Sequence, residues 1–167
     1  MQKKLFRYTL LGIFCTSIAG TLFHFLYQWS GTFFIALIAP VNESIWEHMK
    51  LLYFPMLFYC TFENCRLKPD FPSLACSNKA ALLLGTFLIP VLFYTYSGIL
   101  GTNYPILDAG ILYLSTVIAF IFSYKLTLKK PGQTQCLLLN AAVFLLCLCF
   151  IIFTFRPPEI GIFRVPG

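Results

Sequence analysis

Apolar positions are grouped along the chain into five long segments, which are separated by short stretches rich in charge, proline or glycine. A helix needs ~20 mostly apolar residues to cross roughly 30 Å of hydrocarbon. An intervening apolar run, residues 32–41, is too short to span and predicts a re-entrant or interfacial segment. The pattern therefore predicts an all-α fold in a single integral membrane domain over residues 1–167. The five predicted transmembrane helices cover about residues 8–27, 43–62, 80–98, 104–124 and 136–155.

Composition supports a membrane location. Of the 167 residues, 59% are hydrophobic and only 11% are charged, and the mean hydropathy is +0.80. Soluble domains carry roughly 25% charged residues. The composition thus excludes an ordinary soluble enzyme, a disordered tail and a soluble nucleic-acid binder. We expect the lipid bilayer as a partner and no nucleic acid.

The basic residues predict how the chain is oriented. With five spans, nine of them fall on one side, whereas the opposite connections, residues 28–42 and 99–103, contain no Lys or Arg. Because Lys and Arg concentrate on the cytoplasmic side, we expect a multi-pass protein of the cell membrane with its N-terminus inside and its C-terminus outside. The nine residues are Lys3, Lys4, Arg7, Arg66, Lys68, Lys79, Lys125, Lys129 and Lys130.

The cysteines agree with this orientation. Cys60, Cys65, Cys76 and Cys136 fall at or near the predicted cytoplasmic face, where thiols stay reduced. The pairs 60/65 and 147/149 lack the C-x₂-C spacing of zinc or redox sites. We therefore expect buried thiols that act as small apolar side chains.

Most of the costly polar residues fall toward the predicted outer ends of the spans. Ionisable groups cost about 2.5–3.5 kcal/mol each at the membrane midplane, so they usually face a cavity or one another. We expect one small polar chamber near the outer face. The residues are His24 in the first span, Glu43, Ser44, Glu47, His48 and Lys50 in the second, Tyr94 and Tyr96 in the third, Asp108 in the fourth and Arg156 after the fifth.

Helical spacing at the start of the second span suggests acid–base chemistry. At about 100° per residue, Glu43, Glu47 and Lys50 share one stripe, and Ser44 and His48 form the next. Two carboxylates four residues apart repel each other unless a cation or a proton lies between them. Candidate catalytic or proton-carrying residues are therefore Glu43, Glu47 and His48. Two structural alternatives remain: Ser44 and Glu47 have capping-box spacing, and Asn42 is an alternative N-cap.

Other residues near this end are candidates for binding. Lys50, Tyr94, Tyr96, Asp108 and Arg156 are predicted to contact a substrate, although Lys50 could also snorkel and the tyrosines could be interfacial anchors. A divalent metal is a possible cofactor, with His24, His48 and Asp108 as ligands. The sequence contains no H-x₃-H or H-E-x-x-H spacing to fix such a site.

Two sequence blocks carry a family resemblance. They are HFLYQWSG at residues 24–31 and PVNESIWEHMK at residues 40–50. With residues 94–101, Asp108 and residues 153–158, they resemble an uncharacterised family of small integral membrane proteins, a domain of unknown function common in Firmicutes. The resemblance covers nearly the whole chain. It implies a bacterial membrane protein with no known activity.

Three functional hypotheses follow. The first is transport or permeation of a small solute, ion or proton, and a homodimer is then expected because the single chain shows no inverted repeat. The second is a membrane-embedded, metal-dependent enzyme that acts on a lipid or small substrate at the outer leaflet. Its general base would be His48 or Glu47, and its anion clamp Lys50 or Arg156. The third is a non-catalytic assembly or sensor subunit.

Overall fold

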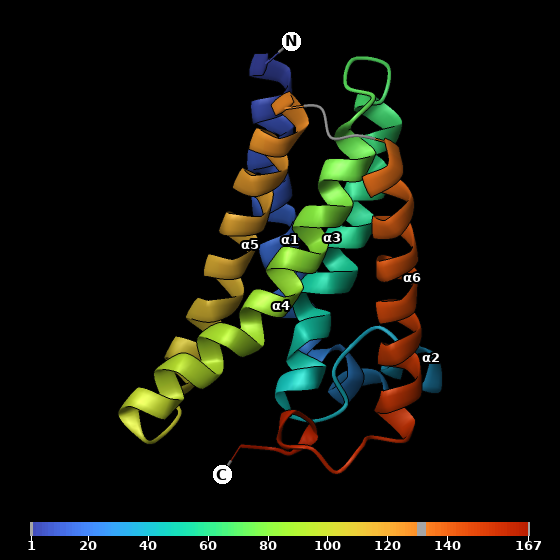
Figure 1. Ribbon diagram of the computed structural model, residues 1–167. Helices are drawn as coiled ribbons and strands as arrows, with labels where there is room; N and C mark the ends of the chain where they lie inside the picture. Colours follow the sequence, from blue (N-terminus) through green and yellow to red (C-terminus); the bar gives the residue numbers. More distant parts are fainter. Residues whose placement is uncertain (1, 130–132, 167) are drawn as a thin grey trace.

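The computed structural model describes residues 2–129 and 133–166 (Figure 1). Helices are the only regular elements in this part of the chain, which confirms the predicted all-α class. Each predicted span lies largely within one long helix. The elements are α1 (Gln2–Ser30), α2 (Phe33–Ala36), α3 (Ile45–Leu67), α4 (Leu74–Leu100), α5 (Pro105–Lys129), α6 (Gln133–Phe155) and the 3₁₀ helix η1 (Gly161–Phe163).

Four helices are long and apolar enough to cross a membrane. They are α1, α4, α5 and the Cys136–Phe155 part of α6. Large apolar side chains on their outer surfaces are exposed, which would be unfavourable in water and is expected of a surface in contact with lipid. The chain is therefore a multi-pass membrane protein.

Helix α3 differs from these four because it is the central helix of the bundle. It packs against α1, α4 and α6, and 15 of its 23 residues are buried. Figure 1 shows it running between the same two ends of the bundle as its neighbours. A central helix can keep charged side chains, because protein groups rather than lipid surround them.

Small residues allow the helices to approach closely in the middle of the bundle. A Cβ atom added to Gly20 of α1 would lie 2.6 Å from the backbone oxygen of Leu51. One added to Gly85 of α4 would lie 2.7 Å from Cβ of Ala119. Glycine at such contacts lets membrane helices pack backbone to backbone.

One end of the bundle, which we call the tail end, carries residues 31–44, 101–104 and 156–166. At this end α4 and α5 diverge from α3 and α6 (Figure 1). The run predicted to be re-entrant or interfacial contains the single turn α2, whose Phe33 stacks on Phe155 at 5.0 Å. The C-terminal segment folds back so that Phe163 packs on Trp46 of α3.

The other end of the bundle, which we call the basic end, carries the N-terminus and residues 68–73. Lys4 forms an ion pair of 2.7 Å with Asp70 there. Within the bundle near this end, the Glu63 carboxylate accepts a hydrogen bond of 2.9 Å from Asn78, and Asn78 accepts one from Ser123. Lys130 lies outside the described residues.

The structure corrects the expectation of separate thiols at the basic end. Cys76 and Cys136 are joined in a disulfide between α4 and α6, with their Cα atoms 5.0 Å apart. The sequence argument considered only cysteines close together along the chain, whereas these two are 60 residues apart. The two cysteines meet because the first turns of α4 and α6 lie at the same end of the bundle.

Candidate functional site

The polar residues at the tail end divide into two clusters with different surroundings. The first, the buried pair, consists of Glu47 and Lys50, whose side chains are 2% and 0% exposed. Lys50 Nζ lies 2.7 Å from Glu47 Oε2 and also donates to the Ala36 carbonyl at 3.1 Å and to Thr154 at 2.5 Å. The three N–H donors of the Lys50 ammonium group thus each have an acceptor within the protein.

Glu47 is held as completely as its partner. Its carboxylate accepts hydrogen bonds from the backbone N–H of Val41 at 3.0 Å and from the Thr154 hydroxyl at 3.1 Å. These contacts join α3 to the segment before it and to α6. The buried pair is therefore a structural tie, and neither residue is accessible for acid–base work or for anion binding.

The start of α3 explains why Glu43 does not accompany Glu47. The helix begins at Ile45 with Ser44 as its N-cap, and the Ser44 hydroxyl accepts from the backbone N–H of Glu47 at 3.4 Å. The side chain of Asn42 accepts from the backbone N–H of Ser44 at 2.9 Å. The predicted stripe of Glu43, Glu47 and Lys50 is wrong, because Glu43 precedes the helix and does not follow its 100° spacing.

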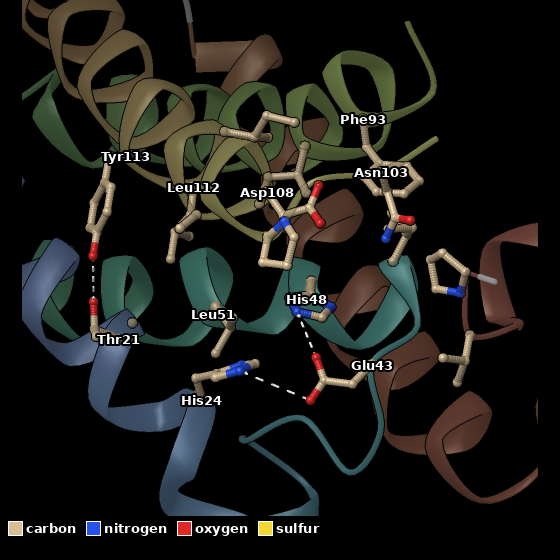
Figure 2. A pocket seen from close by; sticks show the side chains of 18 of the residues that line it. Thr21, His24, Glu43, His48, Leu51, Phe93, Asn103, Asp108, Leu112 and Tyr113 are labelled. Atoms are coloured by element: carbon tan, nitrogen blue, oxygen red, sulfur yellow. Dashed lines mark hydrogen bonds and ion pairs between the residues drawn. The ribbon is translucent and has the colours of Figure 1, made fainter. Parts of the chain in front are cut away.

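The second cluster lines a cavity of about 490 Å³ between α5 on one side and α1 and α3 on the other (Figure 2). It exists because α4 and α5 diverge at this end, and the C-terminal residues 165–166 complete its wall. Most of the lining is apolar. The polar lining residues are Thr21, His24, Glu43, His48, Asn103, Asp108 and Tyr113.

Glu43 lies between two histidines in this cavity. Figure 2 shows its carboxylate pointing toward both imidazole rings. Glu43 Oε2 is 3.3 Å from His48 Nε2, and Glu43 Oε1 is 3.9 Å from His24 Nε2. The two rings are 5.4 Å apart between centroids, although they come from different helices, α1 and α3. The loop before α3 thus brings a carboxylate to a pair of imidazoles.

A hydrogen bond with the backbone orients the imidazole ring of His48. His48 Nδ1 lies 2.9 Å from the carbonyl oxygen of Ser44, which can only accept, so Nδ1 carries a proton. In a neutral ring, Nε2 then has a lone pair that faces the carboxylate of Glu43. A divalent cation between them would bind both the imidazole nitrogen and the carboxylate oxygen.

The three side chains form a group that could hold a metal ion. One ligand atom from each of His24, Glu43 and His48 lies within 4.8 Å of the other two. Metal–ligand bonds of roughly 2.0–2.2 Å in a tetrahedral site place neighbouring ligand atoms about 3.3 Å apart. Metal-binding histidines usually donate their other N–H to a carbonyl or carboxylate, as His48 does to Ser44.

Asp108 lines the same cavity but lies outside this group of three ligands. It projects from the first turn of α5 toward His48 (Figure 2). One of its carboxylate oxygens accepts from the Tyr96 hydroxyl, which in turn accepts from the backbone N–H of Tyr104 at 3.2 Å. The pair Tyr96 and Asp108 ties α4 to α5 and fixes the carboxylate at the cavity wall.

Of the five predicted substrate contacts, Asp108 lines this cavity and the other four do not: Lys50 is in the buried pair, and Tyr96 reaches the cavity wall through Asp108. Tyr94 is 47% exposed on the outside of α4, and Arg156 is exposed beyond the end of α6. The sequence argument missed Thr154, Thr21 and Tyr113, which occur in otherwise apolar helices. It also missed Glu63, whose ionisable side chain within a long helix was a usable signal.

These features define a class: a helical multi-pass membrane protein with a polar-rimmed cavity at one end of its bundle. Within this class, the chain belongs to the Family of unknown function (DUF6512), whose model matches residues 1–166. Neither the search of curated proteins nor the search of solved structures finds a match to this chain.

Proposed function

We propose that this protein is a membrane-embedded, metal-dependent enzyme whose metal is held by His24, Glu43 and His48. The observation that carries the proposal is that these two imidazoles and one carboxylate lie at the cavity with a ligand atom of each within 4.8 Å of the others. Two histidines and one carboxylate are the protein ligands of catalytic zinc sites and of non-haem iron sites. Both kinds of site keep a coordination position for a substrate.

The surroundings of the three ligands favour catalysis over a structural metal. Structural zinc sites are closed by four protein ligands, usually with cysteine among them. Here three ligands face a cavity that is large enough for a second molecule. A divalent metal supplies Lewis acidity, which polarises a carbonyl or phosphoryl oxygen and makes water more acidic.

Asp108 is the best candidate for a general base in this site. Its hydrogen bond from Tyr96 occupies one carboxylate oxygen and orients the other, and its side chain points into the cavity from the helix opposite His48. A positioned carboxylate can accept a proton from water or from a substrate hydroxyl. Glu47, which the sequence suggested for this role, is held in the buried pair.

Transport has less support. The cavity is at one end of the bundle, and at its wall α1 and α3 approach so closely that a Cβ added to Gly20 would lie 2.6 Å from the Leu51 backbone oxygen. The volume of about 490 Å³ is more than ten times the ~30 Å³ that one water occupies, which suits an organic ligand better than a single ion. The hypothesis of a non-catalytic assembly subunit explains the buried pair, which holds helices together, but it does not explain the cavity.

We infer the orientation of the protein in the membrane from the positions of its Lys and Arg residues. We take α3 as a fifth crossing, because it runs antiparallel to α1 within the same bundle. The basic end then lies in the cytoplasm and the tail end, with the cavity, lies outside. The metal site would thus act at the outer leaflet.

Metal analysis of the purified protein tests the proposal. The protein should be prepared with an affinity tag that contains no histidine and analysed by inductively coupled plasma mass spectrometry. We expect wild type to retain a stoichiometric divalent transition metal, and we expect His24→Ala, His48→Ala and Glu43→Gln to lose it. Asp70→Asn, which removes a carboxylate at the basic end, is the matched control and should retain the metal. Equal metal content in all five proteins would contradict the proposal.

A further inference from the structure

The cavity has two chemically different parts. Its polar side chains are concentrated near the tail end, around His24, Glu43, His48 and Asp108 (Figure 2). Toward the middle of the bundle, the lining is apolar except for Thr21 and Tyr113. We call this apolar part the floor, and it consists of Leu51, Ile89, Phe93, Ile111 and Leu112. A ligand that fills both parts must itself have a polar group and an apolar body.

The wall between α1 and α5 separates this cavity from the outer surface of the bundle. Thr21 of α1 and Tyr113 of α5 both line the cavity, and both are exposed. Their hydroxyl groups lie 2.9 Å apart and form one hydrogen bond across the gap (Figure 2). We expect the side of this hydrogen bond away from the cavity to face the hydrocarbon of the bilayer.

The neighbouring outer surface is apolar. Phe25 on α1 is 40% exposed and also lines the cavity, and Leu107 and Ile106 at the start of α5 are 43% and 86% exposed. An apolar chain that passes between α1 and α5 would thus stay in contact with apolar groups. The Thr21–Tyr113 hydrogen bond crosses this passage and would have to open.

We propose that the ligand of this cavity is a lipid of the bilayer, one acyl chain of which enters between α1 and α5 and lies on the floor while its polar group reaches the metal ligands. The inference rests on the proposed function and names its substrate class. The volume of about 490 Å³ lies within the roughly 300–1,000 Å³ of small-molecule sites, so the cavity accommodates one chain and not a complete two-chain lipid. The second chain would remain in the bilayer.

Photolabelling in lipid nanodiscs tests the inference. The probe is a phospholipid with a diazirine at the end of one acyl chain, and mass spectrometry locates the labelled residues. We expect labelling of floor residues such as Leu51, Ile89 and Leu112, in addition to lipid-facing residues such as Phe14. Labelling of lipid-facing residues alone in the wild type would overturn the inference without any variant.

A pair of adjacent substitutions provides the control. Ala109 lines the cavity, whereas Gly110 does not and has open space around it. We expect Ala109→Trp to reduce floor labelling at least tenfold and Gly110→Trp to leave it unchanged. Unchanged floor labelling in Ala109→Trp would show that the probe reaches these residues by another route and would overturn the inference.

Metal content separates this inference from the proposed function. Both tryptophan variants should retain the metal, because neither residue is one of its ligands. If the metal is present and floor labelling is absent, the lipid inference fails and the metal site stands. If floor labelling is present in a protein that binds no metal, the proposed function fails, and with it the assignment of the lipid as a substrate.

Discussion

At the scale of single residues, two glutamates four positions apart have opposite surroundings. The side chain of Glu43 is 53% exposed at the cavity and faces two imidazoles, whereas that of Glu47 is 2% exposed and is paired with Lys50. The difference arises from the first residue of α3, because Glu43 precedes the helix and Glu47 is in its first turn. We therefore propose that Glu43 is a metal ligand and that Glu47 stabilises the fold.

The buried pair makes a prediction about stability. Lys50→Met should lower the free energy of unfolding by about 3–5 kcal/mol, because it leaves the Glu47 carboxylate buried without a counter-charge. The double variant Glu47→Gln/Lys50→Met removes both charges and should recover most of this loss. Unfolding followed in detergent micelles measures both effects. A Lys50→Met protein as stable as wild type would show that the pair is not a structural tie.

The metal ligands make a prediction about pH. Imidazole must be free of its second proton to bind a metal, so binding releases protons and weakens as the solution becomes more acidic. Titration of the purified protein against a metal-binding dye at a series of pH values measures this. If His48 and Glu43 form only an imidazolium–carboxylate pair, the protein will show no competition with the dye at any pH.

The end of the bundle at which a polar residue lies was predictable from the sequence, but the grouping of Glu43 with Glu47 and Lys50 was wrong. The prediction placed His24, His48 and Asp108 toward the same end of the spans, and the structure brings all three to one cavity. It placed Glu43 with Lys50 because it began the helix at Glu43, whereas α3 begins at Ile45, so Glu43 does not follow the helical spacing of 100° per residue. A hydrophobicity pattern does not determine the first residue of a helix to within two residues.

At the scale of helices, close contacts in the middle of the bundle hold α1, α3, α4 and α5 together. Gly20 and Gly85 lie at these contacts, and a larger side chain at either position has to displace backbone or a neighbouring helix. The sequence predicted the long apolar segments well, because length and hydropathy are local properties. It did not predict which helix is central, since that depends on contacts between segments that are distant along the chain.

The close contact at Gly20 makes a prediction about packing. Gly20→Val should destabilise the protein by about 1–3 kcal/mol, because its Cβ would lie 2.6 Å from the Leu51 carbonyl oxygen. Gly110→Val is the matched control, since an added Cβ at Gly110 has no neighbour within 4 Å. Thermal unfolding of the two variants in the same detergent provides the comparison. Equal melting temperatures for the two variants would argue against the packing at Gly20.

At the scale of the whole molecule, the two ends of the bundle have different properties. The basic end carries the Lys4–Asp70 ion pair and the disulfide between α4 and α6. The tail end carries the cavity and the buried pair. The function that we propose depends on the tail end being outside, and the disulfide provides a way to examine this orientation.

Cys76 and Cys136 report on which end faces the cytoplasm. Because we place the basic end inside, where thiols stay reduced, we expect this pair to be a dithiol in growing cells and a disulfide after purification in air. Rapid acid quenching followed by alkylation with a maleimide of known mass distinguishes the two states, with Cys76→Ser as the control. A disulfide that is fully formed in growing cells would place the basic end outside.

X-ray absorption spectroscopy of the metal-loaded protein tests the central claim most directly, because it identifies the atoms bound to the metal. The account predicts nitrogen and oxygen ligands at roughly 2.0–2.2 Å with the multiple scattering of two imidazoles. The imidazole signal should disappear in the double variant His24→Ala/His48→Ala. Sulfur ligands at about 2.3 Å, or a shell of oxygen atoms alone, would contradict the proposed metal site.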